Sequence, residues 1–307
     1  MQPKFIFSNI IGTFVFSEQF TIFDKILFRN VEEYKNKDNT EIILKNKYKN
    51  LKVPEKNELT RILSAFNSKE FFPNFHKKNI ELTKEKIKLS VKDDLLVIQA
   101  INSIEENNKV VNLLTRRLRE WYSHYNPEFS NYVNDNKKFI ELLMGKKDKK
   151  TEESMGADLS RENMEPIIDL IKQIDSQYKL KDRQEQYLEK LMKKNCPNLT
   201  AVAGVTIGAK LIEHANSLKH LAELPASVIQ LLGAEKALFR HLKTGARSPR
   251  HGLIVQHPLL SGAPQKIHGK IARALADKIA IAVRIDYFKG KFIGDQLRKE
   301  LEIKLKK

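Results

Sequence analysis

A heptad pattern runs through a long part of the chain that lacks helix-breaking residues. Residues 92–122 contain neither glycine nor proline, the two residues that most often interrupt a helix. Apolar residues recur there at alternating spacings of four and three, which is the pattern of a coiled-coil seam. Two polar residues, Asn108 and Thr115, interrupt this seam. Because a seam asparagine can set the register and the number of partner helices, we expect Asn108 to have this role.

A second heptad pattern begins after Ser160, whose side chain suits the N-cap of a helix, and stops at Pro197. Polar, irregular sequence at 123–160 separates the two patterns, which predicts a long antiparallel coiled-coil hairpin. One alternative is that both helices belong to the plain core of a single domain. We favour a protruding coiled coil that forms a homodimer, because each seam is narrow and flanked by charges. The residues expected to mediate dimerisation are Val97, Ile101, Ile104, Asn108, Val111, Leu118, Ile167, Ile171 and Ile174.

The first 90 residues predict a small α/β domain. Residues 1–30 hold seven of the 16 phenylalanines, and several of them alternate with other residues around Asn9 and Gly12. This period of two predicts two short strands joined by a turn. We expect 41–44 and 48–53 to be further short strands or strand-loop pieces, and 57–66 and 83–91 to be helical.

The composition changes after Cys196, where small and aliphatic residues predominate. This pattern predicts closely packed helices, the last of them at 265–287 and 294–306. The expected fold is mainly α: a small N-terminal α/β domain at 1–90, a long antiparallel coiled-coil hairpin at 91–196, and an all-α C-terminal domain at 197–307.

The chain is strongly basic, which points to a polyanionic partner such as RNA, DNA or an anionic membrane surface. Its 307 residues include 55 Lys and Arg against 38 Asp and Glu, a net charge of +17. The single cysteine, Cys196, cannot form an internal disulfide or a Cys-cluster zinc site, which favours a reducing compartment. No apolar run reaches the roughly 18 residues needed to span a bilayer, and no signal-peptide pattern is present. We therefore expect a cytoplasmic protein without a membrane partner.

Positive charge is concentrated in residues 234–273. This segment has eight basic residues and one acid, Glu235, whereas an ordinary solvated surface mixes both signs. Four of the eight histidines also lie here, which adds hydrogen-bonding capacity beside the charge. Such a segment is typical of a surface that binds phosphate. The basic residues are Lys236, Arg240, Lys243, Arg247, Arg250, Lys266, Lys270 and Arg273.

Helical spacing orders these charges into stripes. A helix at 235–244, closed by Gly245, places three cations on one face and leaves Ala237, Leu238 and Leu242 for the core. The loop at 245–252 has glycine at both ends and Pro249 within it, so we expect a stiff loop that presents two arginines. A second basic stripe lies at 266–273. The two stripes and the loop are expected to converge on one surface.

The histidines suggest a ribonuclease as the enzymatic alternative, but no catalytic motif supports it. The chain has no suitably spaced carboxylate pair, no His-Glu-x-x-His and no phosphate-binding glycine-rich motif. His214 and His220 are six residues apart and would lie on different faces of a helix. We predict no catalytic residue, no metal site and no cofactor in this chain.

Several long motifs resemble the signature of the Nop family. They are GAEKALFRHLKTGA at 233–246, PRHG at 249–252, QHPL at 256–259 and GKIARALA at 269–276. The resemblance extends to ADLS at 157–160, PNLT at 197–200, the helix that ends at Trp121, and the Phe-rich start. By layout the chain is most similar to archaeal fibrillarin-associated Nop proteins, although its first 90 residues match no family motif closely.

The resemblance implies a scaffold of the box C/D RNA-guided 2′-O-methylation ribonucleoprotein, which acts on rRNA and tRNA. In such particles the N-terminal domain binds fibrillarin, which holds S-adenosylmethionine and transfers the methyl group. The coiled coil pairs two scaffold chains, and the Nop domain binds a kink-turn box C/D guide RNA together with its ribosomal-protein-like primary binder. The alternatives are a self-sufficient RNA-processing enzyme and a basic coiled coil on chromatin or membrane.

The residues carried over by the resemblance fall within the basic segment. They are expected to contact RNA or the primary binder. They are Ala234, Glu235, Lys236, Arg240, Lys243, Arg247, Arg250, His251, Gln256, His257, Lys270 and Arg273.

Overall fold

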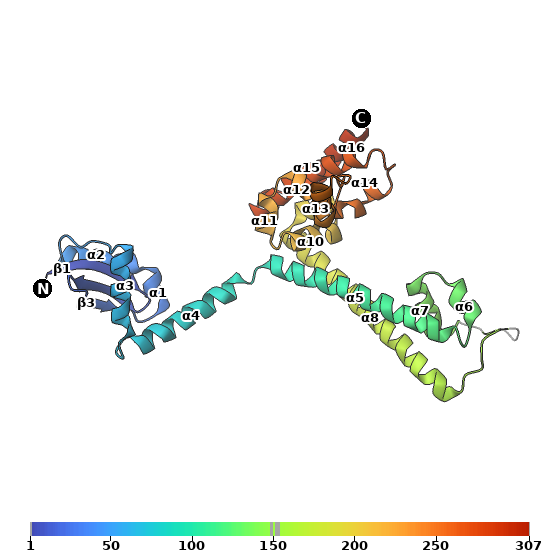
Figure 1. Ribbon diagram of the computed structural model, residues 1–307, viewed down its shortest axis with the longest axis horizontal. Coiled ribbons are helices and arrows are strands. Elements are labelled where there is room, and N and C mark those ends of the chain that lie inside the picture. Colours follow the sequence, from blue (N-terminus) through green and yellow to red (C-terminus); the bar gives the residue numbers. More distant parts are fainter. Residues whose placement is uncertain (1, 148–149, 151–153, 307) are drawn as a thin grey trace. The chain divides into compact units, whose positions relative to one another are not determined.

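The computed structural model describes residues 2–147, 150 and 154–306. They divide into two compact units, Met1–Val91 and Lys92–Lys307 (Figure 1). The fold is mainly helical, with one small sheet in the first unit. None of the helices in the described ranges combines the length and apolar character of a membrane-spanning segment.

The N-terminal sheet is an antiparallel meander of β1 (Pro3–Asn9), β2 (Gly12–Ser17) and β3 (Ile22–Leu27). The expected hairpin around Asn9 and Gly12 is confirmed, and the Asn9 Oδ1 accepts a hydrogen bond from the Ile11 N–H at 2.9 Å. A Cβ on Gly12 would lie 2.4 Å from the Ile26 carbonyl oxygen, so β3 can approach this closely only at a glycine.

The prediction of a strand at 41–44 is wrong. These residues lie in α2 (Lys37–Lys47), which follows α1 (Val31–Lys35). A short apolar run fits a strand or a helix equally well, and here the helix places Thr40 and Leu44 one turn apart on the face toward β2. The Thr40 and Thr13 hydroxyls are hydrogen-bonded at 2.8 Å, and Leu44 is buried. Of the predicted piece at 48–53, only Lys52 pairs with the sheet, through an isolated bridge to Phe5.

Aromatic packing holds the helices of the first unit to the sheet. Phe66 follows α3 (Lys56–Ser64) in the short η1 (Ala65–Asn67), and its ring meets the Phe14 ring edge-on at 4.8 Å. Phe71 packs on Phe14 in the same manner at 5.8 Å. Helix α4 (Phe72–Ser90) begins well before the expected residue 83, with Pro73 in its first turn, where the missing N–H is not needed.

The second unit contains the expected antiparallel helical hairpin, formed by α5 (Asp93–Tyr122) and α8 (Arg161–Asn195) (Figure 1). Cross-helix hydrogen bonds establish the direction: the Asn107 Nδ2 donates to the Gln177 carbonyl at 3.1 Å, and the Gln184 Nε2 donates to the Ser103 hydroxyl at 2.7 Å. Ser160 caps α8 by accepting the N–H of Asn163 at 3.3 Å, as predicted.

The seam asparagine is Asn107, not Asn108. Asn107 is buried and bonded to α8, whereas Asn108 is only half-buried. The sequence predicts that the seam residue after Ile104 is four positions on, but in the structure it is three positions on. Asn107 and Asn108 both lie about one helical turn from Ile104, and tertiary packing selects Asn107.

The residues assigned to dimerisation are buried within this one chain, which corrects that assignment. Seam residues that already pack inside the chain cannot also form the surface that meets a second copy. With Asn108 set aside, their exposed fractions are Val97 1%, Ile101 1%, Ile104 3%, Val111 3%, Leu118 0%, Ile167 0%, Ile171 6% and Ile174 0%.

The two ends of the hairpin pack against different helices. At the end remote from the C-terminal helices, α6 (Pro127–Tyr132) and α7 (Asn136–Met144) cover the seam, with Phe139 fully buried. Arg119 of α5 holds α6 by donating to the Ser130 carbonyl at 2.7 Å, and its guanidinium lies 4.2 Å from the Phe139 ring centre. At the other end Val97 and Ile101 share a core with the C-terminal helices, so the ranges 91–196 and 197–307 form one unit.

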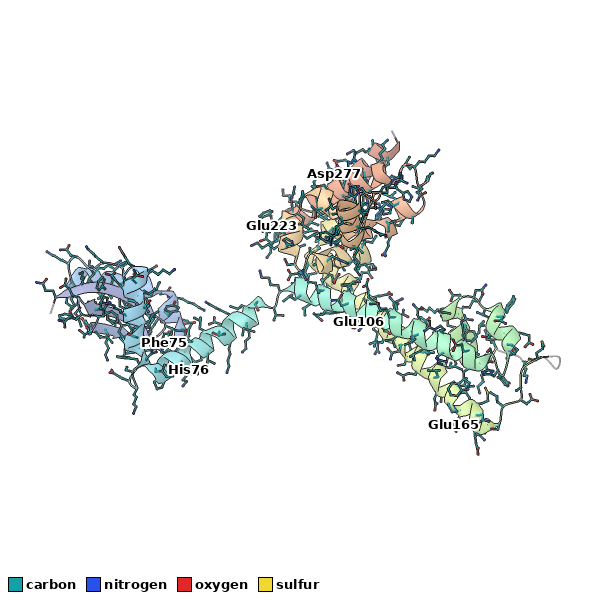
Figure 2. The ribbon with its side chains drawn as sticks, in the orientation of Figure 1. Phe75, His76, Glu106, Glu165, Glu223 and Asp277 are labelled. Carbon is teal, nitrogen blue, oxygen red and sulfur yellow. The ribbon has the colours of Figure 1, made fainter. Side chains whose placement is uncertain are left out.

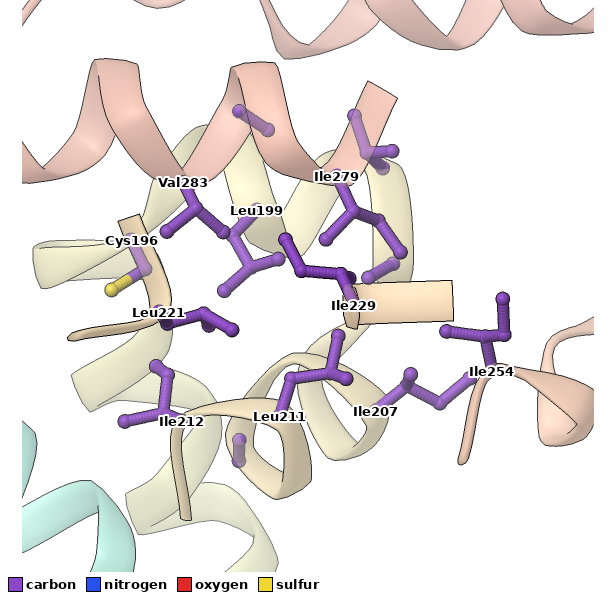
Figure 3. Packing of buried hydrophobic residues seen from close by; sticks show 14 of the residues in the cluster. Cys196, Leu199, Ile207, Leu211, Ile212, Leu221, Ile229, Ile254, Ile279 and Val283 are labelled. Atoms are coloured by element: carbon purple, nitrogen blue, oxygen red, sulfur yellow. The ribbon is translucent and has the colours of Figure 1, made fainter. Parts of the chain in front are cut away.

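The C-terminal helices surround α15 (His268–Tyr287), which packs against most of its neighbours. Figure 3 shows the apolar side chains that meet there, among them Leu199, Leu221, Ile279 and Val283. The helices around α15 are α9 (Pro197–Ala203), α10 (Val205–His214), α11 (Leu218–Glu223), α12 (Ala226–Leu231), α14 (Pro258–Ser261) and α16 (Gly294–Lys306).

Two buried polar residues organise this core. Asp286 accepts hydrogen bonds from the Asn198 N–H, the Asn198 amide and the Leu199 N–H at 3.1, 2.8 and 2.8 Å. The Asn198 Oδ1 in turn accepts the Ile293 N–H at 2.7 Å, which joins the start of α9 to the connection before α16. Cys196 is buried beside them, and burial raises the pKa of its thiol to about 12, which makes it unreactive.

A charged residue in the seam tests its role in folding. We expect Ile101→Asp to lower the free energy of unfolding by more than about 3 kcal/mol, because it buries an unpaired carboxylate in the core. Thermal unfolding followed by circular dichroism measures this loss. Asn112→Asp, on the exposed side of α5, is the matched control and should unfold like the natural chain. If the Ile101→Asp protein were as stable as the natural chain but monomeric, the seam would form the contact between two copies after all.

Candidate nucleic-acid interface

Helix α13 (Glu235–Thr244) carries the first basic stripe, as the sequence predicts. Ala234 is its N-cap residue, and the Glu235 Oε1 accepts the Gly233 N–H at 2.6 Å. Gly245 ends the helix with φ +68°, a left-handed conformation that glycine adopts without strain. Lys236, Arg240 and Lys243 are all exposed, so their charges are free to meet a ligand.

The apolar face of α13 is not covered in the way the sequence predicts. Ala237 and Leu238 are half-buried, but Leu242 is 70% exposed and Phe239 is 62% exposed. The expectation that Leu242 faces the core is therefore wrong, and Phe239 is a surface residue that sequence reasoning missed. An i, i+4 apolar pair has the same spacing whether it faces a core or a partner, so spacing alone does not separate the two cases.

The loop at 245–252 is held at both ends. At its start, a hydrogen bond joins the His241 Nδ1 to the Ala246 carbonyl. At its end, the Gln230 Nε2 donates to the Arg250 carbonyl at 2.7 Å and the Gly252 N–H donates to the Gln230 carbonyl at 2.8 Å. These bonds fix the loop before any ligand arrives, so docking costs less conformational entropy.

The loop also meets the start of α15. The Arg250 Nη1 donates to the Gln265 carbonyl at 2.9 Å, and the rings of His251 and His268 lie 5.5 Å apart. These residues surround a hollow of about 280 Å³ lined by Arg247, Ser248, Arg250, His251 and Gln265. The loop therefore meets the start of α15, and the convergence of both basic stripes with the loop on one surface stays a prediction.

The cations of this region have no acidic partner among the described residues, whereas several lysines on neighbouring helices do. Within the described ranges, ion pairs on α15 and α16 join Lys278 to Glu300 and Asp277 to Lys304. Asp277 is labelled in Figure 2. No ion pair and no side-chain hydrogen bond involves the following basic residues of the described chain. They are Lys236, Arg240, Lys243, Arg247, Lys266, Lys270 and Arg273.

Two predicted contact residues have partners within the chain. His257 is half-buried; its Nδ1 accepts the Leu259 N–H at 3.3 Å as the cap of α14, and the ring is also bonded to the Val202 backbone. This side chain positions α14, so we withdraw it from the expected contact set. Gln256 is exposed, and its Oε1 accepts a hydrogen bond from the Lys210 Nζ at 3.3 Å.

Burial lowers the pKa of His251 below its usual range, and the neighbouring His268 and Arg250 lower it further. The site is thus a cationic surface with a neutral histidine in it. No cluster of three metal-ligating side chains exists among the described residues. The arrangement offers hydrogen-bond donors and positive charge for phosphate groups.

The sequence matches the Nop family model, described as "snoRNA binding domain, fibrillarin", over residues 103–307. The chain belongs to the Nop family. The matched range begins within α5 and includes most of the hairpin, the loop and every cation of the site.

Individual relatives agree with this assignment. A NOP5 family protein of Methanocaldococcus jannaschii is 41% identical over 263 residues, which cover 78% of this chain and 63% of that protein. Nucleolar protein 58 of Mycosarcoma maydis is 38% identical over 228 residues, or 67% of this chain and 39% of the relative. The chain thus spans less than two thirds of the length of these relatives.

A solved chain from a fibrillarin/Nop5p complex aligns with 97% of this chain and 99% of its own length, at 22% sequence identity and a TM-score of 0.46. The family assignment comes from the sequence matches, because a superposition of this quality does not establish a common fold.

Gly252 tests the rigidity of the loop. A Cβ at this position would lie 2.0 Å from the Leu232 carbonyl oxygen, a backbone atom that cannot move aside. We expect Gly252→Ala to lower the free energy of unfolding by about 2 kcal/mol, as measured by urea titration. Gly269→Ala is the control, because its Cβ would enter open space. Equal stability of the two variants would show that the loop adjusts freely.

Proposed function

We propose that this chain is the scaffold subunit of a box C/D RNA-guided 2′-O-methylation ribonucleoprotein. The C-terminal unit binds the guide RNA, and the N-terminal unit binds a fibrillarin-type methyltransferase. The observation that carries the proposal is the set of unpaired cations on α13, the loop and α15, in a chain that belongs to the Nop family. Phosphate groups supply the negative charge that the chain itself does not provide there.

The proposed contribution of this chain to methylation is positioning. The basic surface offers hydrogen-bond donors and cations, and we assign the methyl transfer and the S-adenosylmethionine to the partner enzyme. A prearranged loop between two fixed ends suits a folded RNA, which is recognised by shape and backbone. Because the NOP5 relative is archaeal, we place the particle in the cytoplasm of an archaeal cell.

Phe239 and Leu242 add exposed apolar surface to the proposed basic site. Two large apolar side chains, 62% and 70% exposed, stand between the cations of α13. An aromatic ring among cations suits the stacking of an unpaired base, and an exposed leucine suits a protein surface. This combination supports a composite target of kink-turn RNA and its ribosomal-protein-like binder.

The proposed homodimer uses the outer surface of the hairpin. With the seam buried, the apolar residues left on α5 include Val110 and Leu113, which are 45% and 57% exposed and one turn apart. Ile168 of α8 is 42% exposed. A second copy of the hairpin that covers these residues would remove their apolar surface from water.

Removal of two cations tests the RNA-binding role. We expect Lys236→Ala combined with Arg247→Ala to weaken binding of a box C/D guide RNA by about tenfold or more, and to reduce the slope of log K against log salt by about two. Filter binding at several salt concentrations measures both quantities. The charge-matched control replaces Lys172 and Arg183 of α8 by Ala, and should leave both unchanged.

The scaffold role is tested in the same experiment by adding the methyltransferase and the kink-turn-binding protein. Transfer of labelled methyl groups to a target RNA should require this chain and should fall in the double variant. Transfer by this chain alone, or equal activity of the double variant and its control, would contradict the proposal.

The dimer has its own test. Val110→Asp with Leu113→Asp places charges on the exposed apolar patch and should yield a folded monomer, as judged by sedimentation equilibrium and circular dichroism. Asn112→Asp, between them, changes charge without removing apolar surface and should remain dimeric. If the double variant kept the mass of the dimer, the contact between the two copies would have to lie on another face of the hairpin.

A further inference from the structure

The hollow beside the basic loop has the composition of a site for one oxyanion. Two arginines, a serine hydroxyl, an imidazole and the Gln265 backbone surround it, with no carboxylate among the lining residues. Its volume of about 280 Å³ admits a phosphate or sulfate group. Arg250 is fixed by its hydrogen bond to the Gln265 carbonyl, so its guanidinium is already in place for a ligand.

The rings of His251 and His268 differ in their hydrogen bonds and in their position relative to the hollow. The His268 Nε2 is 2.9 Å from the Ala263 carbonyl oxygen, and a carbonyl only accepts, so Nε2 carries the hydrogen. Its Nδ1 is buried without a partner, and a proton there would create a buried N–H with no acceptor. Of the two histidines, His251 is the one that lines the hollow, so an anion there would stand beside its ring.

The groups that face His251 oppose protonation of its ring in the empty hollow. They are His268 from α15, and Arg250 and Arg247 from the loop, with Ser248 and Gln265 uncharged. An anion in the hollow would reverse this balance, because a negative charge beside the imidazolium favours the protonated ring.

We propose that this hollow binds one phosphodiester group of the RNA backbone, and that His251 takes up a proton from solvent when the anion enters. The inference rests on the proposed function for the identity of the natural ligand. Neutral imidazole and a solvent proton give imidazolium, so the only exchange is one proton per anion bound. Acidification from pH 8 toward pH 5 raises the affinity for the anion. The affinity stops changing with pH once His251 is protonated in the empty protein as well.

Sulfate is the probe, because its charge is constant between pH 5 and 8. Histidine ring resonances of the full chain are followed by NMR, with His251→Gln used to assign the His251 signal. Without sulfate the His251 signal should titrate below the range of a free histidine, as its surroundings dictate. With sulfate the midpoint should move upward, and the sulfate affinity should rise several-fold, and at most tenfold, for each unit of falling pH.

Variants separate binding from proton uptake. Arg247→Ala should weaken sulfate binding about tenfold and abolish the upward movement of the His251 midpoint. His251→Gln should bind sulfate with an affinity that does not change with pH. Lys172→Ala on α8, outside the lining of the hollow and outside the basic surface, should behave like the natural chain. An unchanged His251 midpoint in saturating sulfate, or a pH-independent affinity in the natural chain, would overturn the proposal.

A second experiment uses a box C/D guide RNA in place of sulfate. It tests the anion site and the proposed RNA-binding function separately. Sulfate-linked protonation without guide-RNA binding would leave the anion site standing and would reject the proposed function. Tight guide-RNA binding with no change at His251 would leave the proposed function standing and would reject this site.

Discussion

Helices α5 and α8 bury a seam between them that is apolar on both sides of Asn107, and both ends of that seam continue into the rest of the unit. Near Val97 and Ile101 it merges with the core around α15, and near Leu118 and Ile174 it meets the cap made by α6 and α7. A hairpin of isolated helices would have no such support, because helix pairs gain most of their stability from tertiary packing. The seam therefore sets the position of everything that follows α8, including the basic loop.

The basic surface of α13 and the loop at 245–252 is built differently from the seam. Its backbone is satisfied, since the loop at 245–252 is bonded to His241 at one end and to Gln230 at the other. Its side chains are left unsatisfied, with cations that have no acidic neighbour and two exposed apolar residues on α13. A rigid frame with open charges is suited to a partner that arrives already folded, because little ordering is needed at contact.

The predictions that succeeded rest on long or repeated signals. The two heptad helices and the hairpin at Asn9–Gly12 each involve many residues that agree. The failures are local. Residues 41–44 fit either a strand or a helix, and Asn107 and Asn108 are neighbours on the same helical turn. Leu242 has the spacing of a core residue, but no other part of the chain covers it. In each case the deciding energy comes from a neighbour distant in the chain, which local spacing does not contain.

The sequence by itself determined that the chain is mainly helical, that it contains a long hairpin, and that one segment of 40 residues is almost free of acidic residues. Periodicity and charge are properties of order along the chain, so they are readable there. Only the tertiary structure decided that the seam is filled by the chain's own helices, that Phe239 is open while His257 is engaged, and that His251 meets His268 beside two arginines. These facts depend on which surfaces cover one another, and burial is a property of the packed molecule rather than of any residue type.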